Sequence, residues 1–129
     1  MAETSWDELP APVAQRFHAP RRGGCPEPAT GYACGSAGGV RGGTLLVLWL
    51  RTEAGRIADA RFEAFGGPAA IACGEWLCEW LPGKTPEQAR ELNGLVLAER
   101  LQLRPAERGV ALLAEDALKA ALADGERIR

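Results

Sequence analysis

The sequence predicts an α+β domain in which helices pack on an antiparallel sheet. A continuous apolar run over residues 44–50 is followed, after turn residues, by strand-like alternation over 58–64. Helical patterns then fill most of the second half of the chain. Strands first and helices afterwards are typical of α+β rather than of alternating α/β architecture. The chain has 129 residues, 47% of them hydrophobic, which is enough for one domain with a sizeable core.

The first third of the chain is predicted to be mostly irregular. Residues 1–12 hold acids and two prolines and predict a loose leader, and a short helix follows over Val13–His18. From Gly23 to Gly43 the chain is dense in glycine, a composition that predicts a loop rather than a long regular element. Cys34 lies near the middle of this expected loop.

A β-hairpin is predicted next. The run Thr44–Leu50 contains β-branched and aromatic residues, and Glu53-Ala-Gly55 offers turn chemistry after it. In the second strand the side chains alternate in character, with one face formed by Ala58, Ala60, Phe62 and Ala64. Such alternation is expected where one face of a sheet is covered. Helices must supply that cover.

The remaining elements are predicted to be helical. Pro68 suits the first turn of a helix over 68–81, which Pro82 and Gly83 end. A second helix over 85–92 has an N-cap threonine, a proline at its first position and a glutamine placed for a capping box. We expect a short apolar turn over 95–101, and apolar residues then repeat at helical spacing over 110–122.

Composition and charge exclude several classes of function. A net charge of -2 gives no electrostatic reason to expect nucleic acid or an anionic membrane as a partner. The N-terminus carries acids where a signal peptide needs bases, and no segment is long enough to span a bilayer, so we expect a cytoplasmic location. One histidine and no Gly-x-Ser-x-Gly segment argue against an enzyme. The expected organisation is a flexible leader over 1–12, one domain over 13–124 and a tail over 125–129.

Two segments carry a resemblance to a known family. The segments GRIADARFEAFGGPAAIA, over Gly55–Ala72, and LAEDALKAALAD, over Leu113–Asp124, resemble the iron-sulfur cluster scaffold family of IscU and the NifU N-terminal domain. Cys34-Gly35-Ser36 is also similar to the family's first ligand motif, Cys-Gly-Asp. The resemblance implies a three-stranded antiparallel sheet with helices on one face. It also implies a role in assembling a two-iron, two-sulfide cluster.

Most of the family's cluster ligands are absent from the matching positions. By carry-over, Cys34 is retained, whereas Gly67 replaces the second cysteine, Val110 the third, Gly109 the neighbouring histidine, and Ser36 the aspartate associated with cluster release. Iron in such clusters is held by soft anionic thiolates, and neither glycine nor valine has a side-chain donor. Cys34 is therefore the predicted metal-binding and cluster-binding residue.

The other three cysteines are weaker candidates. Cys73 and Cys78 lie on the helix predicted over 68–81 and are about 140° apart around its axis, so they do not readily chelate one metal together. Core packing explains both. Cys73 is nearer in sequence to Gly67 and is the better substitute ligand. Cys25, in a Gly-Cys-Pro loop, is interpreted as an exposed or partly buried thiol, with a metal role as the alternative.

Two functions fit these residues. The first is a scaffold-like protein that binds iron or a two-iron, two-sulfide cluster through Cys34, as a monomer or a homodimer. The alternative is a degenerate, cluster-free module that binds the assembly machinery or another protein. The resemblance implies a cysteine desulfurase and cluster-recipient proteins as partners. Docking of an Hsp70-type chaperone is not expected, because Leu103–Glu107 reads LRPAE where many family members have Leu-Pro-Pro-Val-Lys.

Overall fold

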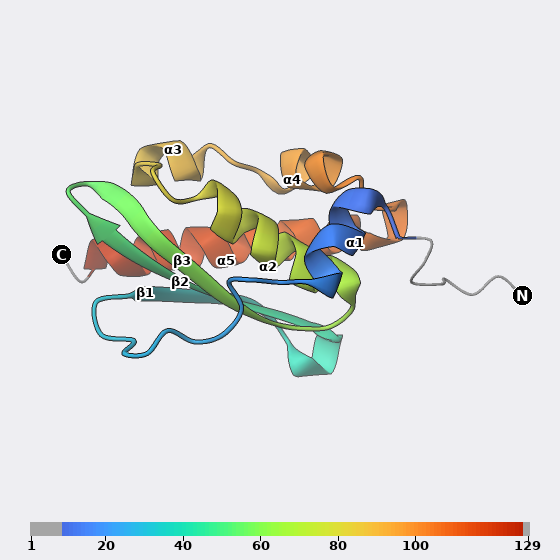
Figure 1. Ribbon diagram of the computed structural model, residues 1–129, viewed down its shortest axis with the longest axis horizontal. Helices are drawn as coiled ribbons and strands as arrows, with labels where there is room; N and C mark the ends of the chain where they lie inside the picture. Colours follow the sequence, from blue (N-terminus) through green and yellow to red (C-terminus); the bar gives the residue numbers. More distant parts are fainter. Residues whose placement is uncertain (1–8, 128–129) are drawn as a thin grey trace, which may run out of the picture.

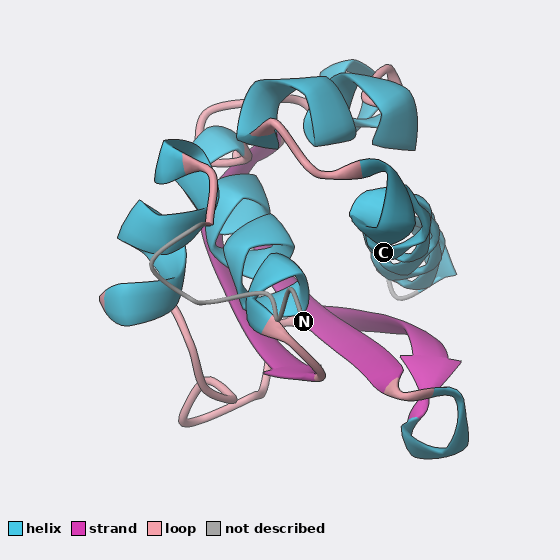
Figure 2. Ribbon diagram, turned by 90° about the vertical axis from the view of Figure 1, so that its right-hand side faces the viewer, coloured by secondary structure: helices cyan, strands magenta, loops and turns pink. Residues whose placement is uncertain are grey.

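The computed structural model describes residues 9–127, and its helices cover one face of a three-stranded antiparallel sheet with strand order β1-β2-β3 (Figures 1 and 2). This confirms the predicted fold class. The elements, in chain order, are α1 (Ala11–His18), β1 (Ala33–Gly39), the 3-10 turn η2 (Val40–Gly42), β2 (Thr44–Glu53), β3 (Arg56–Phe65), α2 (Pro68–Trp80), α3 (Pro86–Arg90), α4 (Gly94–Leu101), the 3-10 turn η3 (Pro105–Glu107) and α5 (Arg108–Arg127).

The predicted hairpin is confirmed as β2 and β3. Alternate residues of β2 are buried beneath the helices, and β3 contributes Phe62 to the same face. The prediction was wrong at one position, because Ala58 is exposed and its neighbour Ile57 is buried. A register irregularity between Arg51 and Thr52 is the cause, since a bulge shifts the alternation of side chains by one residue.

The glycine-rich segment contains a strand that composition did not predict. Residues 33–39 form β1, which pairs with β2, so the expected loop over 23–43 is interrupted. Helix α5 lies directly on this strand. A Cβ atom built on Gly35 would stand 2.1 Å from the backbone nitrogen of Ala121, so only glycine permits the contact. Small residues here reflect tight helix packing rather than irregular backbone.

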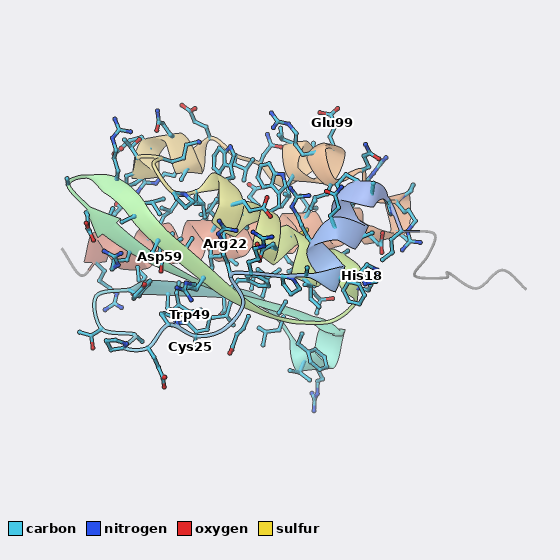
Figure 3. The ribbon with its side chains drawn as sticks, in the orientation of Figure 1. His18, Arg22, Cys25, Trp49, Asp59 and Glu99 are labelled. Carbon is cyan, nitrogen blue, oxygen red and sulfur yellow. The ribbon has the colours of Figure 1, made fainter. Side chains whose placement is uncertain are left out.

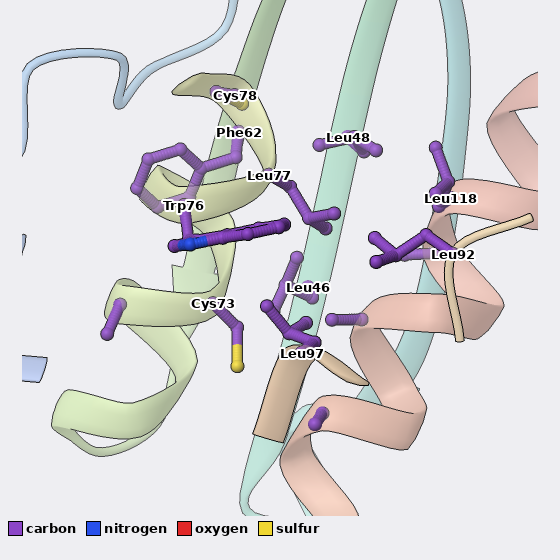
Figure 4. Close-up of a cluster of buried hydrophobic side chains, with 14 of the residues drawn as sticks. Leu46, Leu48, Phe62, Cys73, Trp76, Leu77, Cys78, Leu92, Leu97 and Leu118 are labelled. Carbon is purple, nitrogen blue, oxygen red and sulfur yellow. The ribbon is translucent and has the colours of Figure 1, made fainter. Parts of the chain in front are cut away.

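Helices α2 and α5 bury the apolar face of the sheet (Figure 4). Leu46 and Leu48 of β2, Leu77 of α2 and Leu118 of α5 are fully buried in one cluster. The ring of Phe62 occupies the space beside Gly74, where a Cβ would come within 2.2 Å of it. The predicted helices over 68–81 and 110–122 are confirmed, with α5 running further in both directions.

Two further helices lie beyond α2. The capping box predicted at the start of α3 is present, because Gln88 N–H donates to Thr85 Oγ1 and Thr85 N–H donates to Gln88 Oε1. The apolar turn predicted over 95–101 is wrong, since this segment is helix α4. Asn93 caps it by accepting from Val96 N–H, and its apolar residues are buried at helical spacing.

The segment after α1 is attached to the outer edge of β3. Helix α1 begins at Ala11, and residues 1–8 of the predicted leader lie outside the described part of the chain. Gly24 N–H donates to Phe62 O, and Phe62 N–H donates to Arg22 O. From this edge the chain runs along the side of the sheet that faces away from the helices and reaches β1 (Figures 1 and 2). We call that side the open face.

Candidate functional site

Cys34 lies on the open face of the sheet, in β1. Its neighbours Ala33 and Gly35 are buried against the helices, whereas Cys34 and Ser36 are exposed. The backbone N–H of Cys34 donates to Asp124 Oδ2 at 2.8 Å, so the last part of α5 caps the free edge of this strand. An unpaired N–H on an edge strand can pair with a strand of another molecule, and the hydrogen bond to Asp124 prevents this at Cys34.

The electrostatic surroundings of Cys34 favour its protonated form. Partial burial raises the pKa of this thiol, and the negative charges of Asp124 and of a Cys25 thiolate raise it further. Only the thiolate binds metal well, so metal binding at Cys34 must release a proton that the protein holds firmly.

The positions where the family's other ligands would stand gather at one end of the sheet. Gly67 is the N-cap of α2 and Gly109 lies in the first turn of α5, and both are exposed. A Cβ added to either residue would meet no atom within 4 Å, so there is room for a side chain. Val110, next to Gly109, is half-buried and packs against the core.

Close contacts show that these positions surround the turn between β1 and β2. A Cβ on Gly66 would lie 3.1 Å from Gly43 O, and one on Gly38 would meet both Thr44 and Leu113. The start of α2, the start of α5 and the turn η2 therefore meet at the same end of the molecule. We call this region the vacant end, defined by Gly67, Gly109 and Val110.

Cys34 does not lie at the vacant end. Phe65, at the end of β3, pairs with Leu45, whereas Cys34 pairs with Trp49. Four residues of β2 separate these two levels, which corresponds to about 14 Å along the strand. Helix α5 gives a second measure, because Asp124 at Cys34 is 14 residues beyond Val110, or about 21 Å along the axis. The structure therefore does not bring Cys34 together with the other family positions.

Cys73 and Cys78 are buried in the helical layer, as core packing predicts (Figure 4). Burial, with a smaller contribution from Glu107, raises the pKa of Cys73 to about 12. Burial likewise raises the pKa of Cys78. Cys73 stands on the covered side of the sheet and Cys34 on the open face, so the sheet itself separates the two thiols.

Cys25 is the residue whose position sequence reasoning least anticipated. It is exposed and lines a surface pocket on the open face together with Arg51 and Arg61 (Figure 3). The same pocket is lined by Tyr32, two residues before Cys34, so Cys25 and the start of β1 lie in one neighbourhood. The spacing of the two cysteines in the sequence does not predict this, because the path of the intervening loop decides where Cys25 lies.

Within residues 9–127, no group of three or more His, Cys, Asp or Glu side chains is arranged to hold a metal ion.

Comparison with known proteins identifies the family to which this fold belongs. The family model described as NifU-like N terminal domain matches residues 10–129. The chain belongs to this family. The IscU scaffold protein of Rickettsia prowazekii, named for iron-sulfur cluster assembly, is 42% identical over 86 residues, covering 64% of this chain and 66% of that relative. The Drosophila melanogaster iron-sulfur cluster assembly enzyme IscU is 35% identical over 114 residues, covering 87% of this chain and 74% of that one.

Solved structures share the same fold. A nitrogen-fixing NifU-like protein (N-terminal) from Brucella abortus superposes with a TM-score of 0.70 at 15% identity, covering 97% of this chain and all of that one. At this identity the likeness concerns the fold alone. Among the described residues of this NifU-like chain, no helix is both long and apolar enough to cross a membrane.

Proposed function

We propose that this NifU-like chain is a scaffold-like protein of iron-sulfur cluster assembly that completes its metal site with donors from outside the single chain. The family match over residues 10–129 carries the proposal, together with the names of the curated relatives. The exposure of Cys34 on the open face supports it, because donors from a second subunit or a small thiol can reach this thiol from outside the chain.

Iron and sulfide are the cargo in this proposal, and the chain itself performs no enzymatic step. A cysteine desulfurase supplies the sulfur, and the cluster passes to recipient proteins. An Hsp70-type chaperone is not included, because Glu107 pairs with Arg104 inside the chain and reverses the charge that the family's recognition segment carries. We place these partnerships in the cytoplasm, where disulfides are reversible and a thiol such as Cys34 is available to react.

Anaerobic reconstitution with iron and sulfide tests the proposal, with and without a small thiol and over a range of protein concentrations. We expect visible charge-transfer absorption only when a small thiol is present or when concentration favours a dimer, and we expect Cys34→Ala to weaken it. Cys78→Ala is not a suitable control because that side chain is buried, whereas Cys25→Ser changes an exposed thiol of the same face. Absence of the absorption under every condition would refute cluster binding.

A second candidate is a cluster-free module that binds the assembly machinery. The separation of Cys34 from the vacant end favours it. A single thiol with a raised pKa supplies one ligand only, and that ligand must lose a proton before it binds metal. Affinity capture with the cognate desulfurase and recipient proteins distinguishes the two candidates. The module predicts a stable complex that iron and sulfide do not change, whereas the scaffold predicts a complex that depends on the cluster.

A further inference from the structure

Two exposed thiols, those of Cys25 and Cys34, lie on the open face, away from the vacant end. Cys34 is opposite Trp49 in β1 and β2, and Trp49 is opposite Arg61 in β3. Cys25 lines a pocket with the same Arg61, one residue after the backbone bond that fixes Gly24 to β3. Cys25 shares that pocket with Tyr32, which stands two residues before Cys34. The loop has therefore carried Cys25 back over the sheet towards β1.

From this arrangement we propose that Cys25 and Cys34 form a reversible intramolecular disulfide, with a low-molecular-weight disulfide such as oxidised glutathione as the oxidant. Both thiols are free and exposed in the structure described here. The two buried cysteines on α2 cannot compete, because oxidant does not reach them. The inference does not depend on the proposed function, since it requires neither iron nor a partner.

The connecting loop can close the bond without breaking the core. Residues 27–31 are all exposed, so their movement costs little packing. The loop is held at its two ends, by Gly24 on β3 and by the hydroxyl of Tyr32, which donates to Asp59 Oδ2. The guanidinium of Arg51 lies over the Tyr32 ring, 5.9 Å from its centre. Anchored ends keep the two cysteines near one another, and the exposed middle has little packing to lose when the sulfurs take up the narrow geometry that a disulfide needs.

The chemistry is ordinary thiol–disulfide exchange in two steps. The thiolate of one cysteine attacks a sulfur of oxidised glutathione, which forms a mixed disulfide and releases one glutathione thiolate. The thiolate of the other cysteine then attacks the protein sulfur of that mixed disulfide, which forms the Cys25–Cys34 bond and releases the second glutathione. The protein pair loses two electrons and two protons, and glutathione gains both.

The consequence is a switch on the thiol that the resemblance assigns to the family's first ligand position. In the oxidised pair Cys34 has no thiolate, so it can neither bind iron nor accept sulfur. The ring closed by residues 25–34 would also fix the loop that borders Arg51 and Arg61. Reduction by a thiol restores both properties.

Mass spectrometry of the full chain after anaerobic treatment with oxidised glutathione tests the proposal. Trypsin cleaves after Arg22 and Arg41, so Cys25 and Cys34 fall in one peptide, 23–41, while Cys73 and Cys78 fall in peptide 62–84. After alkylation of remaining thiols in denaturant, we expect peptide 23–41 to be unalkylated and lighter by two hydrogens. Peptide 62–84 should be alkylated on both cysteines and serves as the internal control.

Two further comparisons keep the test decisive. Cys25→Ser and Cys34→Ser should each give peptide 23–41 with a single glutathione adduct or a single alkyl group and no internal bond. Closure in the wild-type chain should be faster when the protein is folded than in concentrated urea, because the fold brings the thiols together. Equal rates in the two conditions, glutathione on both cysteines, or disulfide-linked dimers as the main product would overturn the proposal.

Discussion

Replacement of Glu75 should destabilise the segment after α1 by removing the carboxylate that holds Arg21 and Arg22. Glu75 is the one buried charged residue of the described core, only 2% exposed on α2. Its Oε1 accepts from the backbone N–H groups of Arg21 and Arg22, each at 2.9 Å, and its Oε2 accepts from Arg22 Nη1 at 3.0 Å. Truncation leaves three donors without this acceptor, and breaking such a buried pair from one side costs about 3–5 kcal/mol. Because Arg22 is about 39% exposed and water reaches it, we expect Glu75→Ala to cost about 3 kcal/mol.

Urea denaturation measures this cost, and two variants calibrate it. Glu75→Gln keeps one oxygen for the two backbone donors but turns an amide towards Arg22, so we expect about 1–2 kcal/mol. Glu79→Gln, one helical turn further along α2, removes a more exposed pair with Arg16 at 2.9 Å and should cost about 0–1 kcal/mol. If the free energy of unfolding of Glu75→Ala lies within about 0.5 kcal/mol of the wild-type value, Glu75 does not anchor the segment after α1.

Three other expectations follow from the same contacts. Gly35→Ala should lower the free energy of unfolding by about 3 kcal/mol, because the new methyl group meets the α5 backbone, and thermal unfolding measures this. The pKa of Asp124 is lowered, first by the β1 N–H that it accepts, so its stabilisation is present above pH 3.8 and is lost as pH falls through the lower folded value. The difference in melting temperature between wild type and Asp124→Asn should therefore shrink below pH 3.8, and a constant difference would contradict it. The triple variant Gly67→Cys, Gly109→His and Val110→Cys should retain more iron after gel filtration than the wild type does, since Gly67 and Gly109 have room for donors.

Local signals predicted the elements whose stability is largely local. The capping box of α3 and the helical spacing of α5 are recorded in neighbouring residues, and both are confirmed. Local signals did not predict strand β1, because a glycine-rich composition is typical of a loop. Its glycines are explained only by the close packing of α5 on this strand. Position 35 must be glycine because a Cβ there would collide with the backbone of Ala121, a residue 86 positions later in the chain. Long-range packing of this kind overrides local propensity.

The candidate site shows the same limit more sharply. The sequence placed Cys34 at the family's first ligand position, but strand register decides where its thiol stands, and that register sets it opposite Trp49. Register depends on the pairing of β1 with β2, which the glycine-rich composition does not specify. The position of Cys25 near the start of β1 could not be predicted from the sequence either, since an exposed loop can take many paths between two fixed ends.

Because the vacant end and the thiol pair are about 14 Å apart along β2, changes at the two places should be nearly independent. Donors introduced at Gly67, Gly109 and Val110 should therefore raise iron retention by the same factor whether Cys34 is present or replaced by serine. A scaffold that used Cys34 together with the vacant end would instead lose most of the gain in the Cys34→Ser background. Additivity in this comparison would thus separate metal chemistry at the vacant end from redox chemistry on the open face, and strong coupling would mean that the protein changes shape to unite them.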